Sequence, residues 1–139
     1  MDGVPPIEIM LAHEDERKII LHEEYHDPWS WDDFYAALDQ ERAITRTANG
    51  RTVYRVVDLR GTTFVPPGAI QHFRRASERL VQNPSPFGMT VYVTTDPFVR
   101  ALGNLLRSRF PQAGRNIRRA ATLPEAYLLI QRLSRDEAF

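Results

Sequence analysis

The sequence predicts an α/β fold with a mixed sheet of about five strands, in the order ββαβαβαβα. Two neighbouring β-rich segments near the N-terminus are joined by a short polar turn, which predicts an antiparallel hairpin. Segments rich in β-branched residues then alternate with helical patterns, as in parallel sheets with crossover helices. The length of 139 residues suits one domain spanning 1–139.

Composition excludes several classes of protein. Hydrophobic residues make up 42% and charged residues 26% of the chain, as in ordinary globular domains. The chain has no cysteine, so disulfide frameworks, thiolate nucleophiles and cysteine zinc sites are excluded. There is no apolar run of about 20 residues, and residues 1–6 lack the features of a signal peptide. We expect a cytoplasmic protein without membrane insertion.

The N-terminal hairpin is expected from residues 7–11 and 17–25, which are enriched in β-formers. Residues 13–16 are polar and predict the turn between them. Asp27-Pro28 then ends the second strand.

A first helix is expected to begin after Ser30 and to run to about Thr47. Ser30 stands three residues before Asp33, which matches a capping box. The apolar residues that follow have helical spacing: Trp31, Phe34, Tyr35 and Leu38.

The middle of the chain predicts strand, helix and strand. Asn49-Gly50 is a turn signal before the β-branched segment 53–59. Apolar residues at helical spacing predict a second helix, which residues 83–86 end. A further strand is expected at 89–94. The inner face of the second helix consists of Ala69, Phe73, Ala76 and Leu80.

The last elements begin with clear capping signals. Asp96 and Pro97 supply an N-cap and a first-turn proline for a third helix, which Pro111 ends. Residues 117–121 form a brief last strand, and 122–125 match a capping box for the final helix.

Several of these segments carry a family resemblance that spans nearly the whole chain. The chain resembles the SpoIIAA-like, or STAS/SEC14-type, small bacterial proteins in four segments: 29–38, 56–60, 96–102 and 122–126. The motifs are strand ends and helix starts, which identify a fold better than an activity.

The resemblance implies a signalling role with a particular switch. STAS relatives include anti-sigma-factor antagonists, in which a Ser or Thr at the start of the helix after the central strand is phosphorylated. In this chain a proline occupies that position, within 58–69, and Thr62 and Thr63 lie earlier in the loop. We therefore expect a relative that lacks the usual phosphorylation site.

One string matches a metalloprotease pattern to the letter. Residues 22–26 read H-E-x-x-H, which requires a helix so that both imidazoles reach one zinc ion. Here the string continues a predicted strand, where His22 and His26 are roughly 13 Å apart. One metal cannot bind both, so no metal site and no cofactor are predicted. There is also no serine elbow or phosphate loop, so no catalytic residue and no enzyme activity are predicted.

Formal net charge is zero, but the charges are divided along the chain. Residues 1–45 hold 12 acidic and 3 basic residues, whereas 46–139 hold 6 acidic and 15 basic residues. This polarity fits an acidic face that neutralises a basic neighbour within the fold or in a homodimer, or a basic surface for an anionic partner. Six arginines lie between Arg100 and Arg119, but stacking aromatics are not interleaved, so a nucleic-acid partner is not expected.

The candidate binding residues lie at or just after the carboxyl ends of the predicted parallel strands. Ligands and partners of open α/β sheets meet the loops and helix starts at these ends. Each residue also has a purely structural interpretation, such as capping a loop or starting a helix. The candidates are Asp58, Arg60, Thr62, Thr63, Gly68, Arg74, Thr95 and Arg100.

Two functions remain open. The first is a non-enzymatic regulatory module that binds a protein partner through the loop and helix at 60–75. The second is a small-molecule or lipid-binding module, which the SEC14-type side of the resemblance implies. An apolar pocket between a helix and the sheet is the feature that favours the second.

Overall fold

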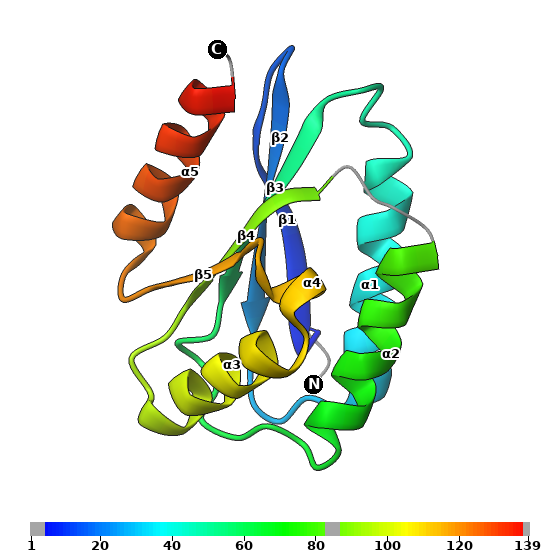
Figure 1. Cartoon of the computed structure of the whole chain (residues 1–139), viewed down its shortest axis with the longest axis vertical. Helices are drawn as coiled ribbons and strands as arrows, with labels where there is room; N and C mark the ends of the chain where they lie inside the picture. The colour runs from blue at the N-terminus through cyan, green and yellow to red at the C-terminus, as the bar shows by residue number, and fades with distance from the viewer. Residues whose placement is uncertain (1–4, 83–86, 138–139) are drawn as a thin grey trace.

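The computed structural model describes residues 5–82 and 87–137, which form one five-stranded sheet with helices on both faces (Figure 1). The strands are β1 (Ile7–Glu14), β2 (Lys18–Tyr25), β3 (Thr52–Asp58), β4 (Phe87–Val93) and β5 (Ile117–Ala120). The helices are α1 (Trp31–Thr45), α2 (Ala69–Gln82), α3 (Pro97–Arg109), α4 (Pro111–Gly114) and α5 (Leu123–Glu137). The α/β class and the five-stranded mixed sheet are therefore confirmed.

The sheet follows the order of the chain, β1-β2-β3-β4-β5. β1 and β2 are antiparallel, and every later neighbour is parallel. Parallel crossovers are almost always right-handed, so three steps in the same direction place their helices on one face. α1 and α2 accordingly lie on one side of the sheet, and α5 lies on the other (Figure 1).

The expected helix starts are confirmed in atomic detail. The Ser30 hydroxyl accepts from the Asp33 amide, and the Asp33 carboxylate accepts from the Ser30 amide at 2.8 Å. The Asp96 carboxylate accepts from the Val99 amide at 3.0 Å and starts α3. These local contacts satisfy amides that have no partner within the helix, which is why sequence alone located them.

Most strand boundaries shift by one or two residues from expectation, as where β4 begins at Phe87, and three differences have a structural reason or consequence. β1 continues through His13 and Glu14 because a bulge between Leu11 and His13 keeps the pairing, and the Asp15 carboxylate closes the shorter turn. α1 ends at Thr45 instead of Thr47. Pro111 ends α3 but also begins the one-turn helix α4. The expected helix end at 83–86 lies outside the described residues.

The main core lies between the sheet and α5. Its buried residues come from β2, β3, β4, β5 and α5, and Val56, Val91 and Ile130 have no exposed surface. Two smaller clusters pack α1 against β1, β2 and β3. α2 contacts neighbouring helices more than it contacts the sheet. A space therefore remains between α2 and the strands.

Candidate functional site

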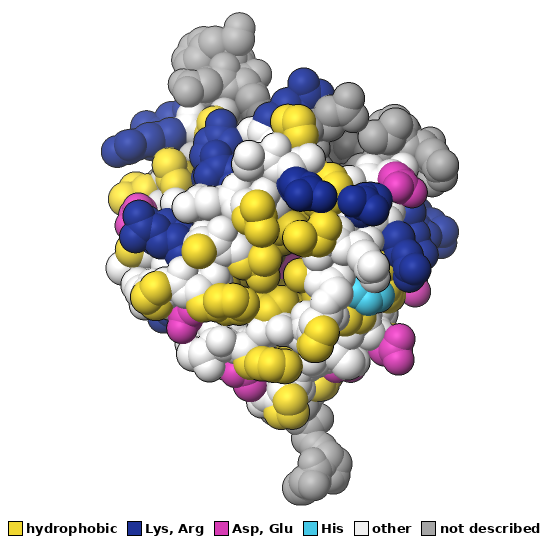
Figure 2. All heavy atoms as spheres, turned by 60° about the horizontal axis from the view of Figure 1, so that its bottom comes forward, with side chains coloured by type: hydrophobic (Ala, Val, Ile, Leu, Met, Phe, Trp, Pro, Cys, Tyr) yellow, Lys and Arg dark blue, Asp and Glu magenta, His cyan; other side chains and the backbone are white. Residues whose placement is uncertain are grey.

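A large cavity lies between the sheet and the helices α1, α2 and α3. Its volume is about 1340 Å³, above the usual range for small-molecule pockets of roughly 300–1,000 Å³. Figure 2 brings the bottom of Figure 1 forward and shows hydrophobic side chains across the centre of this end, with Lys and Arg side chains around them. Apolar lining comes from every neighbouring helix and includes Phe34, Leu38, Phe73, Ala76, Leu102 and Leu106.

Three charged side chains form the floor of this cavity. Glu23 from β2 and Glu41 from α1 are 2% and 3% exposed, their side chains lie beside each other, and Arg55 from β3 pairs with Glu41. An Arg55 Nη donates to Glu41 Oε1 at 2.8 Å, and its Nε donates to the Thr90 hydroxyl at 2.8 Å. Glu23 Oε2 is buried and has no hydrogen-bond partner among the described residues.

Burial and the neighbouring carboxylate of Glu41 raise the pKa of Glu23 well above its ordinary value of 4.5. Burial acts to lower the pKa of Arg55, but the charges of Glu41 and Glu23 outweigh it and raise that pKa. The raised pKa favours the protonated form of Glu23, which lowers the cost of burying it beside the ion pair of Glu41 and Arg55.

A second polar position lies where β4 meets α3. Tyr92 is 6% exposed, and its hydroxyl has no hydrogen-bond partner in the described chain. Burial raises the pKa of Tyr92, against the nearby positive charge of Arg107. The Nε of Arg107 is likewise buried without a described partner, and both residues line the cavity. A Cβ at Gly103 would lie 2.4 Å from the Tyr92 hydroxyl, so only glycine lets α3 approach this ring.

Aromatic side chains hold the loop before α2 against the start of α1. Trp31 stacks on His72 with ring centroids 4.6 Å apart, and its indole donates to the Pro67 carbonyl at 2.8 Å. The Trp29 indole donates to the Thr62 hydroxyl at 3.1 Å. Gly68 follows with φ +92°, which favours glycine. Both tryptophans of the chain line the cavity, so their fluorescence reports on it.

Some of the predicted binding residues line the cavity, and others lie outside it. Thr62 and Arg74 line the cavity, but Thr62 is 1% exposed and its hydroxyl also contacts the Asp27 carboxylate. Thr63 is exposed, and its amide donates to Asp27 at 3.0 Å. Thr95 and Arg100 are exposed at the start of α3 and do not line the cavity.

Asp58 and Arg60 form a pair on the opposite face of the sheet. The Arg60 guanidinium donates to both Asp58 oxygens, at 2.9 and 2.8 Å. Burial acts to raise the pKa of Asp58, but the hydrogen bonds from Arg60 outweigh it and lower that pKa. This pair fixes the loop after β3 and lies beside His22, whose Nε2 is 3.7 Å from Asp58 Oδ2.

The H-E-x-x-H string lies on a strand and its end, as expected, and not on a helix. His22 and His26 face the same side of β2, and each approaches a different oxygen of Glu24. Among the described residues, no group of converging metal-ligand atoms contains both histidines. The metalloprotease geometry is therefore absent from the described chain.

The sequence reasoning missed the cavity floor, although the periodicity held a signal for it. Glu23 alternates in phase with Ile19, Leu21 and Tyr25, which are all buried. Glu41 continues the spacing of Trp31, Phe34 and Leu38 along α1. A carboxylate on the buried face of β2 and another on the inner face of α1 indicate a polar group between this strand and this helix.

Comparison of the chain with protein-family models and with curated proteins finds no match. Within the described part of the chain, every helix is too short or too polar to cross a membrane.

Proposed function

We propose that this protein binds a small amphipathic anion in the cavity between the sheet and helices α1–α3. The observation that carries the proposal is the combination of an apolar cavity of about 1340 Å³ with three lining residues, Glu23, Tyr92 and Arg107, each of which has a buried polar atom without a partner in the described residues. Such groups cost about 1–3 kcal/mol each when buried alone, so a ligand that pairs with them gains affinity.

The charged residues that line the cavity favour an anionic ligand. The cavity is lined by eight arginines but only three acidic residues, Glu23, Glu41 and Glu78. Glu23 and Glu41 lie at the floor, where Arg55 offsets them, so the remaining arginines present positive charge at the walls and rim. A carboxylate or phosphate head beside Arg107 and Tyr92, with an apolar body against Phe34 and Phe73, fits this arrangement.

Titration with decanoate tests the proposal. Trp29 and Trp31 line the cavity, so we expect a saturable change in tryptophan emission as decanoate enters. Decanol has the same chain without the charge and is expected to bind more weakly. Native mass spectrometry of protein purified from its own host then reveals the natural ligand class. No saturable change with decanoate, or equal affinity for decanol, contradicts an amphipathic anion.

The Arg107→Gln variant locates the anionic head. Hydrogen bonds to charged groups contribute about 1.5–3 kcal/mol, so the Kd for decanoate is expected to rise at least about tenfold. Arg132→Gln is the matched control, because Arg132 lies exposed on α5, across the sheet. Equal weakening by both substitutions indicates a general charge effect and places the head elsewhere.

The Ala76→Phe variant tests whether the cavity itself is occupied. Ala76 lines the cavity from α2, so a phenyl group there takes up volume that the ligand needs. We expect loss of decanoate binding with little change in thermal stability. Ala101→Phe on the exposed face of α3 is the control and is expected to leave the Kd unchanged. Unchanged binding by Ala76→Phe rules out this cavity.

A second candidate function is the protein-interaction module expected from the SpoIIAA-like resemblance. The exposed Phe64, at 54%, lies in the loop before α2 and supports a docking surface at 60–75. The Thr62 hydroxyl is buried, so Thr63 is the accessible hydroxyl in that loop for a phosphorylation switch. Affinity capture with Phe64→Ser and Arg74→Glu variants tests this surface, and partners that remain unchanged with both contradict it.

A further inference from the structure

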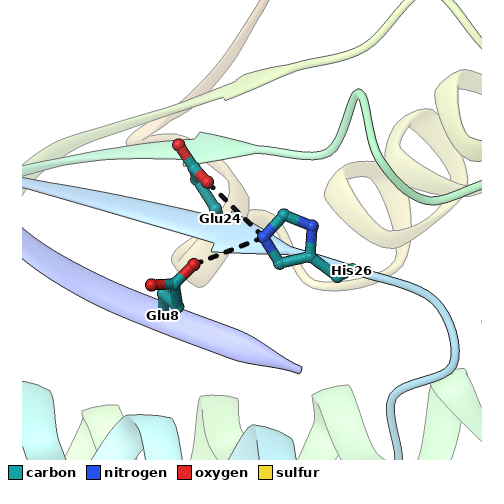
Figure 3. Close-up of side chains that lie close together, drawn as sticks. All are labelled: Glu8, Glu24 and His26. Atoms are coloured by element: carbon teal, nitrogen blue, oxygen red, sulfur yellow. Dashed lines mark ion pairs between the residues drawn. The ribbon is translucent and has the colours of Figure 1, made fainter. Parts of the chain in front are cut away.

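Three metal-ligand side chains converge on the sheet face opposite the cavity, at the end of the β1–β2 hairpin (Figure 3). Glu8 from β1 is directly opposite Glu24 from β2 in the antiparallel register. His26 follows β2, and its amide donates to the Pro6 carbonyl at 2.8 Å, which extends the pairing and fixes the start of its side chain.

The distances match the coordination sphere of a small divalent metal. His26 Nε2 lies 3.4 Å from Glu24 Oε2 and 3.5 Å from Glu8 Oε1. Tetrahedral zinc with bonds of about 2.0–2.2 Å holds neighbouring ligand atoms about 3.3–3.6 Å apart. One atom from each of the three residues lies within 4.8 Å of the others. Small side-chain rotations therefore suffice to place all three around one ion.

The direction of the imidazole nitrogen supports an ion over a simple hydrogen bond. In Figure 3 the Nε2 atom of His26 points between the two carboxylates. This nitrogen is buried and has no hydrogen-bond partner in the described residues, although both oxygens are near. A nitrogen lone pair aimed between two carboxylates is the arrangement that a metal ligand needs.

The charges are unfavourable without a cation. Glu8 and Glu24 are cross-strand neighbours, and like charges directly opposite each other destabilise an antiparallel pair. The ion pairs that the two glutamates make with described residues are with histidines, and the more distant charge of Arg60 also acts on Glu24. A divalent ion between the two strands removes this repulsion.

A neighbouring group of similar composition is less suited to a metal. His22, Glu24 and Asp58 also converge, but His22 Nε2 is farther from both carboxylates, at 3.6 and 3.7 Å. Asp58 is already paired with the Arg60 guanidinium at 2.8 Å. That positive charge opposes a second cation, so we expect a single metal ion.

We propose that Glu8, Glu24 and His26 form a binding site for one divalent transition-metal ion such as Zn²⁺. Imidazole with carboxylates favours zinc and its neighbours over calcium or magnesium, which take oxygen ligands. The three side chains are 30–45% exposed, so solvent or a partner group completes the coordination. The site is separate from the cavity and stands independently of the proposed anion binding.

Calorimetric titration of EDTA-treated, dialysed protein with ZnCl₂ tests this site. We expect one equivalent to bind at neutral pH with a micromolar or lower Kd. His26→Ala removes the nitrogen ligand and Glu8→Gln removes one charge, so each is expected to weaken binding at least about tenfold. Both residues are partly exposed, so the variants are expected to keep the wild-type circular dichroism spectrum.

His22→Ala is the matched control, because His22 lies on the same strand face four residues earlier. It is expected to bind Zn²⁺ within about twofold of the wild type. The absence of saturable binding, or unchanged binding by His26→Ala, overturns the proposal. Equal loss in His22→Ala and His26→Ala overturns it as well, because a site that needs both histidines is different from this one.

Discussion

The two faces of the sheet are built in opposite ways. Beneath α5, apolar side chains from four strands and one helix form the main core, and Ile130 is completely buried. On the α2 face, the sheet presents Glu23 and Arg55 beneath a large cavity. The area beneath α5 is therefore closed by packing, whereas the area beneath α2 keeps open space lined by polar groups.

The connectivity explains why the open face is possible. α2 is a crossover tied at both ends to strands, so it remains near the sheet without the close packing that α1 and α5 have. α5 is held against β3, β4 and β5 by the closed apolar interface of the main core.

The largest expected effect tests this difference in packing directly. Ile130→Ala on α5 is expected to lower the free energy of unfolding by about 2–5 kcal/mol, since it leaves a cavity in a closed core. Phe73→Ala on α2 removes a larger side chain, but that side chain already faces the open cavity, so a loss below about 1.5 kcal/mol is expected. Urea unfolding of both variants gives the two values. An equal or larger loss for Phe73→Ala breaks the comparison.

A smaller effect is expected in the pH dependence of the open face. The pKa of Glu23 is raised in the folded state, so its contribution to stability is fully present below 4.5 and declines as pH rises through the folded pKa. Each unit of the shift corresponds to about 1.4 kcal/mol. Glu23→Gln keeps the shape without the titration, so its unfolding free energy is expected to fall less from pH 4 upward than that of the wild type.

Urea unfolding at several pH values measures this difference. Glu24→Gln is the control, because Glu24 is a neighbour on the same strand that faces the other side of the sheet. Parallel pH profiles for Glu23→Gln and the wild type show that Glu23 ionises normally in the folded protein, which contradicts its raised pKa.

Sequence located the elements but not the contacts between them. The starts of α1 and α3 were predictable because Ser30 and Asp96 cap amides only three residues away. Glu23, Glu41 and Arg55 meet from three different elements, and no local rule specifies that meeting. The spacing of Glu23 and Glu41 from buried apolar residues indicates that both are buried. The tertiary fold decides which charged side chains pair with each other.

The residues predicted from the strand ends lie in different surroundings for a topological reason. The rule that ligands meet the strand ends applies where the strand order reverses and neighbouring loops diverge. Here the order runs from β1 to β5 without a reversal, so Thr95 and Arg100 lie apart from the cavity while Thr62 lines it. The cavity lies beneath the helices and reaches the end of β3 and its loop at Val57, Leu59 and Thr62.

The smallest effect is expected at the Asp58–Arg60 pair, on the α5 side of the sheet. Arg60 is 52% exposed, so solvent weakens the pair, and Arg60→Gln is expected to cost less than about 1 kcal/mol at pH 7. The pKa of Asp58 is lowered, so the contribution of the pair is present above 3.8 and is lost as pH falls through the folded pKa. Urea unfolding at pH 7 and at successively lower pH is therefore expected to show the difference between variant and wild type shrinking. Arg100→Gln serves as the control, because Arg100 makes no ion pair with any described residue. If the difference in unfolding free energy persists after Asp58 is protonated, the Arg60 side chain stabilises the loop after β3 by packing and not by its charge. The α5 side of the sheet then depends on packing even at this exposed pair.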